Sequence, residues 1–427
     1  MRRVAITGVG LITPLGLGAA ATWQGLLEGR SGIGPIRAFD ASSLRTRLAA
    51  EIPEFDPKPY VANRRVLRMM TRNDQFAIGG AALAVQDAGL SVTGQAAERA
   101  GLFVGGNKET SKPESLLEGV LVARAPDGSS DVKRLGESAR SSFPPLFFVE
   151  GLQAASLFYV SEAHGLKGAN TYFAGTAEAG AVALGRAFRA IRRGEADVAI
   201  AGGFDDAASW WTISKYDGMG FMSQSNELGA RACRPFDRDR TGTVLGDGAA
   251  LLVLEEYEVA RARGARVVAE ITGYGTGYDC HGVMTPHPEG RGLVRAMQTA
   301  LDDARTTPGV IAHVAAHGSG TRLGDRSEAR AIRTVFGKDA ERLAGTSVKP
   351  ATGHLMAAAG ALNVAVAALA LQHQVVPPTL NLETVDKDCA VGWVREKPRE
   401  ARMDEALALA RGLSGQNVAL ALRAVRS

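Results

Sequence analysis

The chain has 427 residues, of which 45% are apolar and 22% charged, and its formal net charge is +4. This length and apolar content suit a large core, built as two domains or as one duplicated domain. The 49 basic and 45 acidic residues are too evenly balanced for a nucleic-acid-binding protein. The three cysteines lie far apart and have no zinc-site spacing, which favours a reducing cytoplasm.

The N-terminal part alternates predicted strands and helices, which indicates α/β layers. Residues 3–7 form a predicted first strand, and apolar spacing predicts a long helix over residues 63–90. The segment 107–140 is polar and rich in turn-forming residues, and an apolar helix is expected after it. The glycines after the first strand do not match a dinucleotide-binding fingerprint, because Thr13 stands where a third glycine belongs.

Residues 171–194 contain a predicted strand, a tight turn and a helix that ends at Gly194. A turn of this kind can display a nucleophile near the positive end of the helix. Here the turn carries Ala177 and Glu178, so no nucleophile is displayed there.

The second half repeats the first in outline, which predicts an internal duplication. Residues 353–374 lack Lys, Arg, Asp and Glu, and roughly 20 such residues can cross a membrane. Alanine dominates this stretch, however, and His354, Asn363 and His373 interrupt it. We therefore predict a buried core helix and no membrane span.

Three polar groups stand in predicted loops beside apolar elements. His317 follows a strand, and Lys349 and His354 precede the Ala-rich helix. Neutral imidazoles in such places could stabilise an enolate, although a lone histidine is equally a hydrogen-bonded structural residue. Asp325 and Glu328 could orient the His317 loop or cap its helix.

The chain resembles the β-ketoacyl–acyl carrier protein synthases, the elongating condensing enzymes of fatty-acid and polyketide synthesis. The motifs run nearly end to end and include VAITGVGLITPLG, CRPFDRDRTGTVLGDGAALLVLEE, AAHGSGTRLGDRSEARAI, SVKPATGHLMAAAG and GLSGQN. The resemblance implies a thiolase-like α/β fold, in which two similar βαβαβ halves form five α-β-α-β-α layers. We expect the halves to span residues 1–258, with cap insertions, and residues 259–427.

The resemblance also implies a catalytic set of one cysteine, two histidines and a lysine that supports the second histidine. His317 matches the first histidine, Lys349 the lysine and His354 the second histidine. The cysteine is missing, because its position falls on Ala177, or on Glu178 if the match shifts by one residue. Neither side chain can form the family's thioester.

The closing loop departs from the family as well. The usual GFGGTN reads GLSGQN at residues 412–417. The gate loop at Leu413 and Ser414 therefore lacks the family's aromatic gate residue. We do not expect the acyl pocket of this chain to open in the way that is usual for the family.

Three functional hypotheses follow. In the first, the chain is a non-elongating subunit, similar to the chain length factors that pair with an active ketosynthase and shape its acyl tunnel. In the second, it decarboxylates malonyl-carrier with His317, His354 and Lys349. In the third, it is an ordinary synthase whose cysteine was engineered to alanine at position 177.

The resemblance also predicts partners and location. It implies an active ketosynthase subunit in a heterodimer, with a homodimer as an alternative, and an acyl carrier protein. Arg68 and Arg72 are the predicted docking cations for that acidic carrier. No cofactor or metal is expected, since the carrier's phosphopantetheine delivers the substrates. No nucleic acid or membrane is expected as a partner, and the predicted location is the cytoplasm.

Overall fold

The computed structural model describes residues 1–107 and 113–425. Its main sheet has 11 strands, and all except β2 (Gly16–Leu17) follow one another in a single order. That order is β6 (Asn170–Ala174), β5 (Ala100–Gly106), β7 (Val198–Asp205), β8 (Gly248–Glu256), β1 (Val4–Thr13), β9 (Ala269–Tyr278), β15 (Gln416–Arg423), β14 (Glu405–Arg411), β10 (Ile311–Ala315) and β11 (Ala344–Thr346).

The two ends of this sheet repeat the same pattern of strand directions. From β1 outward, β8 and β7 are joined by antiparallel pairing, and β7, β5 and β6 then run parallel. From β9 outward, β15 and β14 pair antiparallel, and β14, β10 and β11 run parallel. This confirms the two similar halves, which are joined where β1 pairs with β9. The predicted boundary between residues 258 and 259 falls inside the connecting helix α9 (Tyr257–Ala262).

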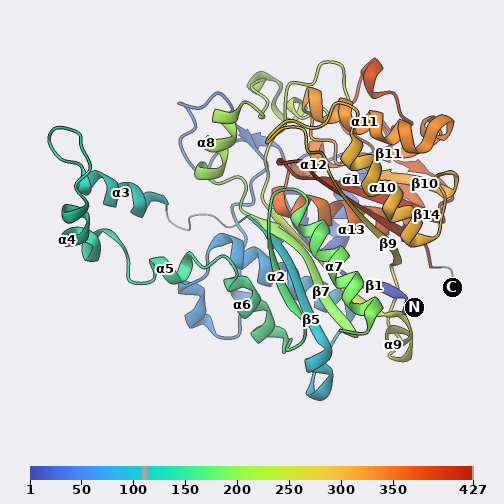
Figure 1. The fold of residues 1–427 in the computed structure, drawn as a ribbon, viewed down its shortest axis with the longest axis horizontal. Coiled ribbons are helices and arrows are strands. Elements are labelled where there is room, and N and C mark those ends of the chain that lie inside the picture. Colours follow the sequence, from blue (N-terminus) through green and yellow to red (C-terminus); the bar gives the residue numbers. More distant parts are fainter. Residues whose placement is uncertain (108–112, 426–427) are drawn as a thin grey trace.

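Helices complete the five layers (Figure 1). Helices α7 (Ala179–Arg193) and α13 (Ala359–His373) contact strands of both halves and form the middle layer. Helices α2 (Arg72–Ala88) and α6 (Ala155–His164) cover one outer face, and α10 (Arg291–Ala304) and α11 (Arg322–Phe336) cover the other. The layered fold is the one expected from the resemblance. The remaining short elements are α1 (Ala19–Leu27), α8 (Trp210–Met219), α12 (Lys349–Thr352), the pair β3 (Gly34–Pro35) and β4 (Leu48–Ala49), and the pair β12 (Val375–Val376) and β13 (Arg399–Glu400).

The Ala-rich stretch near the C-terminus is a core helix, as predicted. Within the described residues, Met356–His373 is the one helical stretch that is long and apolar enough for a membrane span. In this fold, 89% of it is buried inside the protein. Its many alanines fit this place, because small side chains let the two halves of the main sheet approach a shared helical layer closely.

Two glycines near the N-terminus serve packing. The first strand runs on to Thr13, well past the predicted end at residue 7, so the glycines lie inside β1. A Cβ at Gly8 would lie 2.2 Å from the carbonyl oxygen of Ala84, and one at Gly10 would lie 2.0 Å from that of Gly80. The glycines therefore let α2 lie directly on β1, which explains a motif that only resembles a nucleotide loop.

The helix predicted over residues 63–90 was wrong in its first third. Arg64–Arg68 form a separate 3₁₀ helix, and α2 begins only after Thr71. Thr71 and Asp74 form a capping box, in which each side chain accepts a hydrogen bond from the other residue's backbone N–H. The helix ends at Gly89 in a left-handed conformation.

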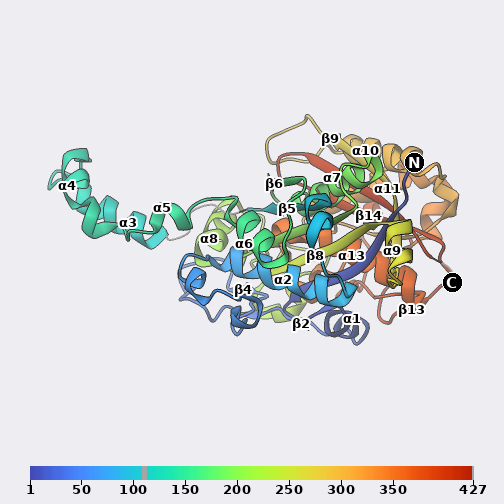
Figure 2. The ribbon, with the colours of Figure 1, turned by 90° about the horizontal axis from the view of Figure 1, so that it is seen from below.

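A helical arm projects away from the layered body (Figures 1 and 2). Residues 108–112 of the turn-rich segment lie outside the described residues, but the rest of that segment was predicted wrongly, because it is largely helical. It forms α3 (Pro113–Ala123) and most of α4 (Val132–Ser142), and α5 (Phe147–Glu150) leads back toward α6. The apolar helix expected next is short, since α6 covers only Ala155–His164.

Candidate functional site

The predicted turn at the start of α7 is present, and it displays no nucleophile. Ala177 lies between β6 and α7 and is 2% exposed. Its carbonyl oxygen accepts a hydrogen bond from the N–H of Gly360 on α13, at 3.1 Å. Position 177 is therefore fixed between the two helices of the middle layer.

The loop that carries His317 is held by a buried carboxylate. Glu328 on α11 accepts hydrogen bonds from the backbone N–H groups of His317 and Gly318, at 2.7 and 2.8 Å. Asp325 on the same helix accepts one from the N–H of Gly320, at 3.1 Å. Of the two roles considered for these carboxylates, orienting the loop is the one observed.

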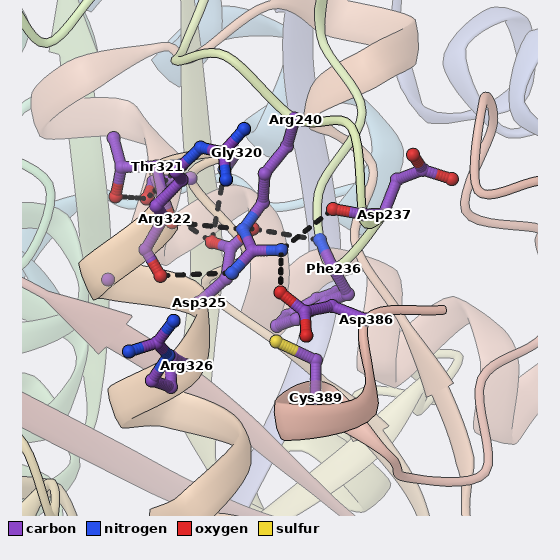
Figure 3. A network of polar contacts seen from close by, with 12 residues as sticks. Phe236, Asp237, Arg240, Gly320, Thr321, Arg322, Asp325, Arg326, Asp386 and Cys389 are labelled. Carbon is purple, nitrogen blue, oxygen red and sulfur yellow. Dashed lines mark hydrogen bonds and ion pairs between the residues drawn. The ribbon is translucent and has the colours of Figure 1, made fainter. Parts of the chain in front are cut away.

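A buried arginine lies beside the same loop, next to Gly320 and Thr321 (Figure 3). The side chain of Arg240 lies between the carboxylates of Asp325 and Asp386, with closest N–O distances of 3.5 and 2.7 Å. Its Nη2 donates to the carbonyl oxygen of Arg322, at 3.0 Å, beside the His317 loop. Burial raises the pKa of Asp325 to about 6, and the nearby Arg240 guanidinium opposes this rise.

Lys349 and His354 meet His317 from the opposite side. The Nζ of Lys349 donates to the backbone carbonyl oxygen of His317. The N–H of Met356 donates to Nδ1 of His354 at 3.0 Å, which leaves the His354 proton on Nε2. The rings of His317 and His354 lie 5.4 Å apart at 77° to each other. The structure therefore brings the three predicted residues together.

Burial sets the charge state of this group. It lowers the pKa of His317 and of His354 well below the usual value of 6.5, and the positive charge of Lys349 adds to both effects. Burial also lowers the pKa of Lys349 to about 8, although Glu328 opposes it. At neutral pH both imidazoles are uncharged hydrogen-bond donors beside a charged ammonium group.

The two histidines line a cavity of about 110 Å³. Ala177, His317, His354 and Leu413 all line it, whereas Lys349 lies behind its wall and Ser414 is absent from its lining. Its wall also includes Thr176, Tyr216, Phe221, Thr243, Leu245, Asp279, Met284, Pro286, Ser319, Thr321, Gly324, Met356, Arg411, Gly412 and Gly415.

Two of these residues were missed by sequence reasoning. The guanidinium of Arg411 is buried and donates to the Asp279 carboxylate at 3.2 Å and to the carbonyl oxygen of Gly324 at 3.1 Å. The hydroxyl of Thr243 is buried and has no hydrogen-bond partner among the described residues. The sequence feature that could have identified Arg411 as a site residue is its position, because it is a charged residue between an apolar strand and the gate loop. Thr243 gave no signal.

The gate loop is tied directly to the turn at residue 177. The N–H of Leu413 donates to Oγ1 of Thr176 at 3.0 Å. The same hydroxyl donates to the Glu178 carboxylate at 2.9 Å, and Glu178 is 5% exposed. Glu178 thus lies in a hydrogen-bonded chain behind Thr176.

The two predicted docking arginines lie in different environments. Arg68 is exposed on the 3₁₀ helix, as docking would require. Arg72 instead turns toward its own chain, where Nη1 donates to the carbonyl oxygen of Phe55 at 3.0 Å and the guanidinium lies 4.6 Å from the Phe76 ring centre. Burial lowers the pKa of Arg72. Its contacts also give Arg72 a structural role, and docking stays a prediction for both arginines.

No metal site was expected. Within residues 1–107 and 113–425, His, Cys, Asp and Glu side chains form no group of three that could hold a metal ion.

Comparisons with known proteins agree with the geometry. The model of the beta-ketoacyl synthase N-terminal domain matches residues 1–260, and that of the C-terminal domain matches residues 268–383. A 3-oxoacyl-[acyl-carrier-protein] synthase 2 of Coxiella burnetii is 35% identical over 424 residues, which is 99% of each chain.

Two solved structures are similar over the full length of both chains. The ishigamide ketosynthase/chain length factor superposes with a TM-score of 0.87 at 30% identity and 100% coverage of each chain. A type II PKS ketosynthase, solved with its acyl-carrier protein and bound to the hexaketide, gives 0.83 at 27% identity, also with 100% coverage of each chain.

Proposed function

This chain belongs to the β-ketoacyl synthase family, and we propose that within it the protein is a non-elongating subunit that pairs with a cysteine-bearing ketosynthase. The observation that carries the proposal is Ala177. It lines the cavity together with His317 and His354, at the position that the sequence resemblance assigns to the family's nucleophile, and an alanine methyl cannot hold an acyl group. The chain length factor within a similar structure supports the same assignment.

The arm offers a surface for such a subunit. Leu117, Val120 and Leu121 on α3 are 49, 63 and 67% exposed, and Phe148 on α5 is 77% exposed. Apolar side chains that cluster in this way on a projecting element mark protein interfaces. Strand β6 is an end strand of the main sheet and pairs only with β5 among the described strands. An open edge and an apolar arm together favour a partner with the same fold.

An acyl carrier protein is the second proposed partner. The carrier named in a similar complex supports it, and exposed Arg68 is a cation suited to an acidic carrier helix. The carrier's phosphopantetheine would bring the acyl group, so the subunit needs no cofactor of its own. We expect Arg68 to act mainly on the rate of encounter, because a single exposed charge adds little affinity.

Co-expression tests the pairing directly. The tagged chain should co-purify with a cysteine-bearing ketosynthase of type II fatty-acid or polyketide synthesis as a one-to-one heterodimer, measured by light scattering. Leu121→Glu on the arm should weaken the pair at least tenfold, by about 1.4 kcal/mol or more. Leu323→Glu is the matched control, because Leu323 is 58% exposed on α11, away from the arm. A chain that stays monomeric or pairs only with itself would remove this proposal.

A second candidate function is favoured by the intact histidines. Nε2–H of His354 and the imidazole of His317 line the cavity and could donate to the carbonyl oxygen of a malonyl thioester. Decarboxylation breaks the bond between the methylene carbon and the carboxylate, releases carbon dioxide and leaves an enolate. The enolate takes up a proton to give an acetyl thioester, and no thiol is needed.

Carbon dioxide release from malonyl-carrier by the isolated chain tests this candidate. If it occurs, His317→Ala should lower the rate by about 10²-fold, the usual effect of removing one oxyanion donor. The rate should not fall as the pH drops through 6.5, because both imidazoles have lowered pKa values and stay neutral there. Unchanged release by His317→Ala, or an acid limb at the pKa of a free histidine, would exclude the proposed donors.

A further inference from the structure

The backbone N–H of Leu413 is a donor beside position 177 that is already in use. Leu413 and Ala177 line the same cavity, and the Leu413 N–H donates to Oγ1 of Thr176, the residue immediately before Ala177. A backbone amide cannot make a second good hydrogen bond while this one is intact. The Thr176 hydroxyl therefore occupies a backbone donor of a residue that lines the same cavity as Ala177.

Glu178 holds the Thr176 hydroxyl in place. Its carboxylate accepts from Thr176 Oγ1 at 2.9 Å and from the Thr176 N–H at 3.4 Å. It also packs on the gate loop, because a Cβ at Gly412 would lie 2.3 Å from a Glu178 oxygen. With its proton committed to Glu178, the hydroxyl oxygen is left to accept from Leu413. The contact thus depends on two side chains that flank position 177 in sequence.

Acyl transfer at position 177 would need such a donor. A cysteine sulfur there would attack the thioester carbonyl, a carbon–sulfur bond would form, and the carbonyl electrons would move onto oxygen as an oxyanion. Collapse of this intermediate would expel the carrier thiolate, which would take up the proton lost by the cysteine. N–H donors aimed at the oxyanion supply much of the rate of such steps.

We propose that Thr176, positioned by Glu178, blocks the Leu413 amide, so that this chain is disabled for acyl transfer at two places and not only at Ala177. The inference rests on the proposed function only in taking residue 177 as the nucleophile position. It predicts that restoring the cysteine alone does not restore acylation.

The experiment compares three variants of the full chain. The first, Ala177→Cys, restores the thiol. The second combines Ala177→Cys with Thr176→Val, which removes the hydroxyl at nearly constant volume. The third combines Ala177→Cys with Thr176→Ser and is the control that keeps a hydroxyl. Each is treated with an acetyl thioester of N-acetylcysteamine, and acylation is followed by intact mass. Alkylation by iodoacetamide is measured in parallel, since it reports thiol access without needing an oxyanion donor.

All three variants should alkylate at similar rates. Ala177→Cys and the serine control should acylate slowly. The valine variant should acylate at least about tenfold faster, and up to about 10²-fold faster, which is the usual rate effect of one oxyanion donor. Equal acylation of Ala177→Cys and the valine variant would overturn the inference, at either a fast or a slow rate. If thermal unfolding shows that the valine variant is not folded, Ala177→Cys with Thr176→Ala takes its place. Pairing with a ketosynthase does not enter this assay, so its outcome is separate from that of the proposed function.

Discussion

Replacing Arg240 by Met should lower the free energy of unfolding by about 3–5 kcal/mol, because it leaves the buried carboxylate of Asp325 without its cation. Arg240 and Asp325 are 1 and 0% exposed, so water cannot replace the lost charge. The loss should be smaller at about pH 5 than at pH 8. The pKa of Asp325 is raised to about 6 even with Arg240 present. As the pH falls toward 5, Asp325 in the folded variant therefore takes up a proton at a pH where the same carboxyl in the unfolded chain stays ionised. The folded state binds more protons, so the stability of the variant rises as the pH falls.

Urea unfolding at both pH values measures this effect. Arg261→Met is the matched control, because Arg261 pairs at 3.5 Å with Glu258 on the surface and both side chains are more than 60% exposed. Such a pair contributes about 0–1 kcal/mol. A loss of less than 1 kcal/mol in Arg240→Met would show that the Asp325 and Asp386 carboxylates need no buried cation. The network in Figure 3 would then not be what holds the His317 loop.

Much of the candidate site could be predicted from the sequence, because its residues lie in short motifs. His317, Lys349 and His354 each occur in a Gly-, Ser- or Thr-rich loop beside an apolar element, and such loops lie at strand ends in α/β folds. The layered fold follows from the alternation of strands and helices and from the resemblance. What spacing could not give was the meeting of the two histidines, since 36 residues and a strand order that is not sequential separate them.

Two of the features that were missed depend on contacts between segments that are separated in the sequence, and the third depends on a local helix cap. Arg72 continues an apolar and basic pattern, and only the fold shows that it turns toward Phe55 and Phe76. The break before α2 depends on the Thr71–Asp74 capping box, which outweighed the apolar periodicity across it. The hydrogen bond from Leu413 to Thr176 joins residues 237 positions apart, and no local pattern predicts it.

A single methyl group at Gly203 should damage both the core and the site. Gly203 on β7 faces the start of the Ala-rich helix, where a Cβ would lie 2.2 Å from the carbonyl oxygen of Ala357. That segment cannot easily retreat, because the N–H of Ala357 is held by the Asp205 carboxylate at 3.1 Å. Gly203→Ala should therefore lower the free energy of unfolding by about 3 kcal/mol, at the upper end of the cost of overpacking.

The control for Gly203→Ala is Gly218→Ala in α8, where an added Cβ meets no atom within 4 Å. An alanine there should be neutral or stabilise the protein by about 0.4–1 kcal/mol, because it restricts the unfolded chain. The two substitutions add the same methyl group, so a difference between them in urea unfolding reports the clash at Gly203 and not the change from glycine to alanine itself.

The same substitution should also affect the site. Ala357 follows His354 by three residues, so a shift of the backbone that relieves the Gly203 clash should also displace the His354 imidazole. In Gly203→Ala, any carbon dioxide release from malonyl-carrier should fall together with stability, whereas Gly218→Ala should leave it unchanged. A Gly203→Ala protein as stable as its control would mean that the middle layer is not packed as tightly as these contacts require.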